Sequence, residues 1–340
     1  GAGTDEAAWE VRMRDLAERV KAGDRRALAR AITLVESTRP DHRAEAARLL
    51  GMLGTRDGPL RVGLSGTPGV GKSSFIERLG MMLADRGLKL AVLAVDPSSS
   101  RSGGSILGDK TRMGELSRHP NVFLRPSPSQ QALGGVGRRT RETILVVEAW
   151  GADVILVETV GVGQSETMVA DMTDVFVLLL APAGGDELQG VKRGIMERAD
   201  LILVNKADGE LRATAERTRA DYAGALRLLR RRGDEPPGFP KALAVSALTG
   251  DGLERAWEAI ETLDRWRREN SVHAMQRRDQ ALAWFREAIE RELMARLKSA
   301  PGAAATEARL AEAVAAGRIT PDAAAEKLVR DLFPDPEPAG

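Results

Sequence analysis

The chain of 340 residues contains no cysteine, only three histidines and no long apolar run. Without cysteine it has neither a disulfide framework nor a thiolate metal site. His42, His119 and His273 are scattered and lack the spacing of a metal-binding motif. No stretch of about 18 apolar residues occurs, so we expect no membrane-spanning segment.

The chain also lacks an excess of positive or negative charge. The 50 lysines and arginines balance 49 aspartates and glutamates, for a net charge of +1. This balance gives no reason to expect nucleic acid or an anionic membrane as a partner. The first residues lack a basic segment followed by an apolar core, so we expect no signal peptide and a cytoplasmic protein.

The apolar pattern divides the chain into regions. Helical spacing over residues 5–54 gives way, after the loop signal "GTRDGP", to short apolar runs that alternate with helical stretches. The predicted strands are 60–66, 89–96, 154–159, 174–181, 201–205 and 241–247. Runs that are apolar throughout are typical of strands covered on both faces. The pattern therefore predicts an α/β fold with a doubly wound, mostly parallel sheet.

Strand signals stop after about residue 264. A strongly amphipathic helix is predicted over 278–297, and two more follow, the last starting at Thr320-Pro321. We therefore predict an N-terminal helical region (1–58), a nucleotide-binding domain (59–265), a C-terminal helical arm (266–333) and a disordered tail (334–340).

The stretch "GTPGVGKSS" fits the phosphate-binding pattern G-x-x-x-x-G-K-[ST] and stands between a predicted strand and a predicted helix, as the pattern requires. Its glycines let backbone N–H groups surround the β-phosphate, and the helix adds its positive N-terminal end. Lys72 is expected to reach the β- and γ-phosphates and the Ser73 hydroxyl to bind Mg²⁺. The predicted phosphate contacts are Gly66, Pro68, Gly69, Val70, Gly71, Lys72, Ser73 and Ser74.

Carboxylates at neighbouring strand ends are candidates for the Mg²⁺ site. Asp96 ends one apolar run and Glu158 ends another. A carboxylate at the end of a buried strand is costly unless a cation meets it, and Mg²⁺ prefers oxygen ligands. Asp109 is a third candidate, although an exposed loop acid is an equally good interpretation of it.

The segment "NKAD" follows a predicted strand about 130 residues after the phosphate loop. Asp208 can accept hydrogen bonds from both donors on the guanine edge, Asn205 suits a position near the guanine carbonyl, and the Lys206 stem can cover the ring. Adenine would leave the Asp208 carboxylate unpaired. Ser246, Ala247 and Leu248, one strand later, could present a backbone N–H to the guanine carbonyl. Together these segments favour GTP over ATP.

With these motifs in view, the chain resembles the MeaB/ArgK-type GTPases over nearly its whole length. The long blocks "AVDPSSSRSGGSILGDKTRM" and "VILVETVGVGQSE" are far more specific than a P-loop alone, and "GDELQGVKRG" is also part of the resemblance. The resemblance implies a GTPase core with N-terminal helices and a C-terminal dimerisation arm. It also implies that Asp96, Asp109 and Glu158 are Mg²⁺ and switch carboxylates, and that 97–112 and 158–171 sense the nucleotide.

Members of this family assist adenosylcobalamin-dependent acyl-CoA mutases, chiefly methylmalonyl-CoA mutase, in cofactor loading and protection from inactivation. The resemblance thus implies such a mutase as the partner, GTP or GDP as ligand and Mg²⁺ as cofactor. It points to a mobile loop that meets the mutase, with the coupling residues Asp186, Glu187, Gln189 and Lys192.

The predicted catalytic residues are Lys72, Asp109, Glu158 and Gly161. In small regulatory GTPases a glutamine follows the equivalent of Gly161 and orients the attacking water. Here Val162 takes that place and Gln164 lies two residues further. We therefore predict slow intrinsic hydrolysis that the mutase accelerates.

Other functions stay open at this point. The client could be a related isobutyryl- or hydroxyisobutyryl-CoA mutase, or the protein could be a kinase or ATPase associated with amino-acid transport. Nickel-inserting GTPases share the core but typically use cysteine and histidine clusters. Apolar residues along the C-terminal helix, including Phe285, Ile289 and Leu293, could pack on their own core or on a second copy; the family resemblance favours a homodimer.

Overall fold

The computed structural model describes residues 2–66, 69–96, 113–126, 135–159, 165–182, 193–229 and 232–335. The chain forms two compact units, Gly1–Ala274 and Met275–Gly340. The division of the chain into four regions stays a prediction.

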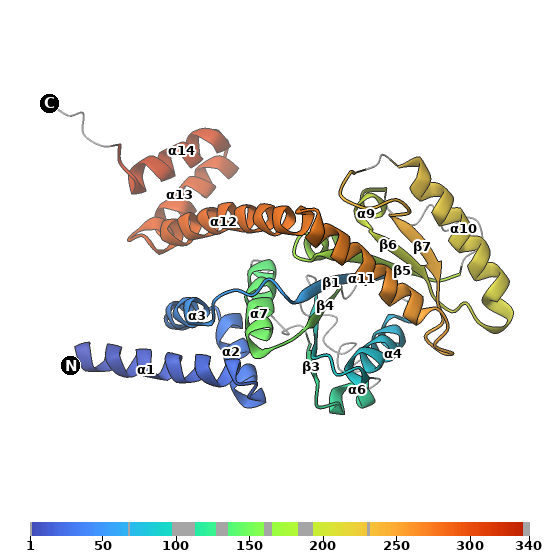
Figure 1. Cartoon of the computed structure of the whole chain (residues 1–340). Coiled ribbons are helices and arrows are strands. Elements are labelled where there is room, and N and C mark those ends of the chain that lie inside the picture. The colour runs from blue at the N-terminus through green and yellow to red at the C-terminus, as the bar shows by residue number, and fades with distance from the viewer. Residues whose placement is uncertain are drawn as a thin grey trace. The chain divides into compact units, whose positions relative to one another are not determined.

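One seven-stranded parallel sheet organises the first unit (Figure 1). Its strands are β1 (Leu60–Gly66), β2 (Leu90–Val95), β3 (Val122–Arg125), β4 (Val154–Thr159), β5 (Val175–Leu180), β6 (Leu201–Val204) and β7 (Lys241–Ala244). The order across the sheet is β3-β2-β4-β1-β5-β6-β7. The chain thus runs from β1 to β2 and β3 on one side, returns to β4 beside β1, and continues through β5, β6 and β7 on the other side. This confirms the predicted parallel α/β fold. The sequence had indicated six strands, and β3 was missed.

Helices cover both faces of this sheet. Leu60, Val62 and Leu64 of β1 share a core with α4 (Lys72–Asp85) and α11 (Leu253–Glu269). On the opposite face, Gly63 lies against α8 (Ser165–Ala170): a Cβ added there would come within 2.8 Å of Val169 Cγ1. The alternation along β1 therefore places successive residues against different helices.

The sheet region contains further helices, of which α7 and α10 are long and the others are short connecting turns. They are α6 (Gly114–Arg118), α7 (Val136–Trp150), α9 (Arg193–Arg198), the 3₁₀ turn η2 (Gly209–Leu211) and α10 (Arg212–Leu228). The helix α7 contacts β2 and β4, whereas α10 lies beside β6 and β7 (Figure 1).

Three N-terminal helices pack on one another and on α7. They are α1 (Ala2–Lys21), α2 (Arg25–Glu36) and α3 (Pro40–Leu53). Asp24 caps α2 by accepting from the N–H groups of Arg26 and Ala27. Leu28, Ile32 and Leu49 are fully buried, so these helices extend the core of the first unit.

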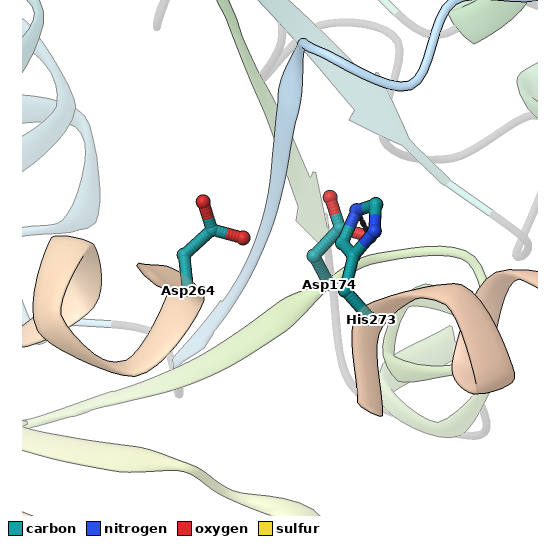
Figure 2. A group of neighbouring side chains, drawn as sticks. All are labelled: Asp174, Asp264 and His273. Atoms are coloured by element: carbon teal, nitrogen blue, oxygen red, sulfur yellow. Dashed lines mark ion pairs between the residues drawn. The ribbon is translucent and has the colours of Figure 1, made fainter. Parts of the chain in front are cut away.

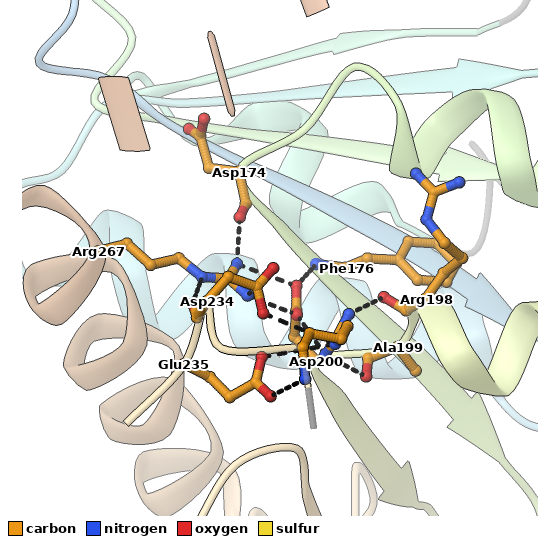
Figure 3. A network of polar contacts seen from close by, with 9 residues as sticks. Asp174, Phe176, Arg198, Ala199, Asp200, Asp234, Glu235 and Arg267 are labelled. Carbon is orange, nitrogen blue, oxygen red and sulfur yellow. Dashed lines mark hydrogen bonds and ion pairs between the residues drawn. The ribbon is translucent and has the colours of Figure 1, made fainter. Parts of the chain in front are cut away.

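A buried polar network ties α11 to the amino ends of two strands (Figure 3). Arg267 donates to the carbonyl oxygen of Asp174 at 2.7 Å and to Asp200 Oδ1 at 2.7 Å. Asp200 Oδ2 accepts from the Phe176 N–H at 2.8 Å, and Arg232 Nη2 donates to Asp200 Oδ1 at 3.0 Å. Because Arg267 is only 2% exposed, its charge depends on these acceptors.

The second unit is helical. The helix α12 (Val272–Ser299) runs into it, and α13 (Ala303–Ala315) packs against α14 (Pro321–Leu332). Thr320 Oγ1 accepts from the Ala323 N–H at 3.3 Å, which confirms the predicted helix start at Thr320-Pro321. Within the residues that the structure describes, no helix combines the length and apolar character that crossing a bilayer requires.

Candidate nucleotide-binding site

The phosphate-binding loop lies where β1 meets α4. The strand ends at Gly66, and Gly71 precedes the first residue of the helix, Lys72. Gly71 has a φ of 80°, and a Cβ added there would lie 2.8 Å from Asn205 Nδ2. Both the left-handed backbone and the close approach therefore require glycine. Because Gly71 brings no capping side chain, the start of α4 is suited to hold an anion.

Lys72 joins this loop to the neighbouring strand. Its ammonium group donates to the carbonyl oxygen of Thr159, the last residue of β4. The Thr159 hydroxyl in turn donates to Ser65 Oγ at 3.1 Å. These contacts hold the cationic end of Lys72 at the carboxyl edge of β1 and β4, where parallel α/β sheets bind their ligands.

Two of the predicted metal carboxylates lie at this same edge. Glu158 pairs in register with Leu64 of β1 and Ala94 of β2, and Asp96 directly follows β2. Alternation along β4 places Glu158 on the face that packs against α4, whose second residue is Ser73. Glu158 and Asp96 are 5% and 8% exposed. Two carboxylates and a hydroxyl form an all-oxygen donor set, which suits Mg²⁺.

Asn205 connects the phosphate loop to a second loop. Its Nδ2 donates to the carbonyl oxygen of Val70 at 2.8 Å, and its Oδ1 accepts from the Ala247 N–H at 3.0 Å. The residue is 2% exposed. Sequence reasoning expected Asn205 only near the guanine carbonyl and missed this bridge.

Lys206 and Asp208 of the "NKAD" segment also bond to the phosphate loop and to the Ser246 loop. Lys206, with a φ of 64°, donates from Nζ to the carbonyl oxygen of Gly69 at 2.6 Å. Asp208 Oδ1 accepts from the fully buried Ser246 hydroxyl at 2.7 Å, and Ser246 Oγ accepts from the Thr249 N–H at 3.1 Å. The structure thus brings together three segments that lie far apart in the sequence.

Other predicted residues are less constrained or lie outside the described residues. Ser74 is exposed on α4, and Leu248 is 78% exposed beside the Ser246 loop. The predicted site, switch and coupling residues outside the described part of the chain are Pro68, Asp109, Gly161, Val162, Gln164, Asp186, Glu187, Gln189 and Lys192.

A second group of metal-binding side-chain types lies at the amino edge of the sheet (Figure 2). Asp174, Asp264 and His273 bring ligand atoms within 4.8 Å of one another. Protein contacts account for this group: His273 Nε2 lies 3.5 Å from Asp174 Oδ1, the Arg61 N–H donates to Asp174 Oδ2, and Arg268 Nε donates to Asp264 Oδ2. We interpret it as an extension of the Arg267 network.

The central strand, the glycine loop and Lys72 at the start of α4 define a P-loop nucleotide-binding protein. Comparison with known families makes this more specific. Residues 28–302 match the family model described as methylmalonyl-CoA mutase-associated GTPase MeaB. The chain therefore belongs to the MeaB family of P-loop GTPases.

Individual relatives agree with this assignment. The chain is 51% identical to a putative GTPase of Caulobacter vibrioides, over 92% of this chain and 96% of that protein. It is 47% identical to the mouse protein named methylmalonic aciduria type A homolog, mitochondrial, over 91% and 76% of the two chains. The crystal structure of a protein called LAO/AO transport system kinase has a TM-score of 0.72 at 37% identity, covering 94% of this chain and 97% of that one.

Proposed function

We propose that the protein is a GTP-binding and GTP-hydrolysing switch that assists an adenosylcobalamin-dependent acyl-CoA mutase in cofactor loading and in protection from inactivation. Methylmalonyl-CoA mutase is the proposed client, on the strength of the family membership. The observation that carries the proposal is the interlocking of the P-loop with the "NKAD" and Ser246 loops through Asn205. The cytoplasmic location expected from the sequence stays a prediction.

Guanine recognition is assigned to Asp208. Its carboxylate can accept from the ring N–H and the amino group of guanine, while Ser246 orients it from the protein side. Adenine would place an acceptor and no donor pair against this carboxylate, which is penalised in a partly buried site. This chemistry argues against an ATP-dependent transport kinase, the function that the name of the solved relative suggests.

The phosphate end uses Lys72 and the start of α4. We propose that Lys72 exchanges its contact with Thr159 for the β- and γ-phosphates when the nucleotide binds. Ser73, Asp96 and Glu158 would hold Mg²⁺, with Asp109 as a further ligand; the ion would supply positive charge beside the phosphates. Gly161 is the proposed backbone contact to the γ-phosphate. With Val162 beside it, we expect slow hydrolysis until the client remodels this loop.

The C-terminal arm is proposed to form a homodimer. Its helix α12 exposes Phe285, Ile289 and Leu293 to 62%, 43% and 57% within the single chain, and they recur at spacings of four along the helix. A second copy would remove this apolar surface from water. A chain that ends at Ala274, where the first unit ends, should be monomeric in light scattering; a dimer would contradict the arm.

The proposal is tested with purified methylmalonyl-CoA mutase and adenosylcobalamin. We expect this protein with GTP to slow the loss of mutase activity during turnover, and we expect no such effect with ATP. Lys192→Ala should abolish protection while GTP binding persists, because Lys192 is assigned to coupling. Lys327→Ala, an exposed lysine on α14, is the charge-matched control.

Protection that does not depend on the nucleotide would contradict the switch. Protection of an isobutyryl- or hydroxyisobutyryl-CoA mutase, but not of methylmalonyl-CoA mutase, would assign a different client.

A further inference from the structure

A small cavity lies on the α7 face of the sheet. Among the described residues it is lined by Glu36 at the end of α2, by the carboxyl ends of β2 and β3, and by the first turns of α7. Its volume is about 20 Å³. A cavity needs roughly 10–15 Å³ of such volume to hold one water molecule, so this cavity has room for about one small occupant.

Arg139 of α7 brings a buried charge to the lining of this cavity. The residue is 4% exposed, and within the described structure its Nε and Nη1 have no hydrogen-bond partner. The neighbouring Arg138 differs, because its Nη1 donates to the Val35 carbonyl oxygen and to Glu142 Oε2, each at 3.0 Å. A buried guanidinium with two unpaired nitrogens is costly, so the site of Arg139 favours a negative partner.

Glu36 does not meet this need. It is occupied by Arg125, whose Nε and Nη2 donate to its two carboxylate oxygens at 3.1 and 2.7 Å. Burial lowers the pKa of Arg139 and the charge of Glu36 opposes that shift, but an arginine stays protonated at neutral pH. Two arginines and one glutamate therefore leave the cavity lining with a net charge of +1.

The start of α7 adds a second positive feature. Val136, the first residue of this 15-residue helix, lines the cavity. The N-cap residue Gly135 lies in the left-handed region and has no side chain with which to cap the helix. The N-terminus of a helix of this length carries partial positive charge and favours anions.

We propose that this cavity is an anion site that binds one monovalent anion of the size of chloride or bromide, held by the Arg139 guanidinium and the N-terminus of α7. One negative charge balances the lining, and the small volume favours a monatomic ion over a phosphate ester or a nucleotide. The bound anion would join α7 to the end of α2 and to the ends of β2 and β3.

The test uses the full chain saturated with GDP and Mg²⁺, so that the phosphate loop does not compete. Sodium bromide replaces sodium gluconate at constant ionic strength, and the thermal unfolding midpoint is measured. We expect the midpoint of the wild type to rise with bromide relative to that of Arg139→Met, by about 2 °C or more once bromide exceeds its dissociation constant about tenfold. Arg30→Met, an exposed arginine on α2, should respond as the wild type does.

An equal bromide response in Arg139→Met would overturn the site. So would a response to inorganic phosphate that exceeds the bromide response and depends on Arg139, because the site would then not be restricted to a small anion. If Arg139→Met does not fold, Arg139→Lys should need about tenfold more bromide for the same rise in the midpoint, since one ammonium replaces a forked donor. Crystals soaked in bromide should show anomalous density beside Arg139; density for water alone would refute the proposal.

Discussion

Replacing Asn205 with alanine probes the joint between the two nucleotide loops. The substitution removes the bonds to the Val70 carbonyl and the Ala247 N–H. Val70 and Ala247 are 1% and 8% exposed, so water does not readily replace either bond. An unsatisfied buried group costs about 1–3 kcal/mol, and two of them lower the free energy of unfolding by about 2–6 kcal/mol.

The same change should weaken GDP binding, because the phosphate loop at Val70 and the Ser246 loop at Ala247 lose the side chain that bonds to both. We expect affinity to fall at least about tenfold, which corresponds to roughly 1.4 kcal/mol. Urea unfolding of the nucleotide-free chain and anisotropy of a fluorescent GDP measure the two effects. Leu248→Ala, at an exposed neighbouring position, should change stability by less than about 0.5 kcal/mol. If Asn205→Ala matched that control in both assays, the bridging role would be refuted.

Three further predictions address the rest of the first unit. Gly71→Ala should abolish nucleotide binding, because its Cβ would lie 2.8 Å from Asn205 Nδ2 at a φ of 80°; retained GDP affinity by calorimetry would contradict this. Arg267→Met should lower the free energy of unfolding, measured in urea, by about 3–5 kcal/mol, because the Asp200 carboxylate loses a buried partner. Adding Asp200→Asn to the same chain should restore part of the lost stability, because it removes the unpaired charge. Burial raises the pKa of the Glu235 carboxyl from 4.5 to about 7. Between these two pH values the native state keeps a proton that the unfolded state releases. The contribution of Glu235 to the free energy of unfolding therefore falls as the pH rises from about 4.5 to about 7. Glu235→Gln should flatten the unfolding free energy over that range; an unchanged pH profile would count against the shift.

The parallel sheet was predictable because its strands are apolar runs interrupted by glycine turns and helical stretches. The P-loop was predictable because its residues are consecutive. β3 was missed because "VFLR" has only three consecutive apolar residues and ends in arginine, whereas the equally short β6, "LILV", is apolar throughout. Strand signals need longer apolar runs than this.

Contacts between distant residues could not be predicted from local patterns. Asn205 and Val70 are 135 residues apart, and Arg267 and Asp200 are 67 apart. Only the folded sheet brings such pairs together. The burial of Arg139 was unpredictable for the same reason. The helical pattern of α7 does not indicate that the end of α2 and the end of β3 lie around this residue.

The assignment of Asp208 to guanine recognition is the central claim, and one substitution tests it directly. In Asp208→Asn the carboxylate that accepts from guanine is replaced by an amide that can donate. We expect the affinity for GTP to fall at least about 100-fold, because two charge-assisted hydrogen bonds of about 1.5–3 kcal/mol each are lost.

Xanthine carries a carbonyl where guanine carries its amino group, and the amide of Asp208→Asn can donate to that carbonyl. The affinity of Asp208→Asn for xanthosine triphosphate should therefore rise above that of the wild type, while ATP stays a poor ligand of both proteins. Calorimetric titration of each protein with the three nucleotides measures this in one experiment. Unchanged GTP affinity in Asp208→Asn, or wild-type binding of ATP as tight as that of GTP, would contradict the account.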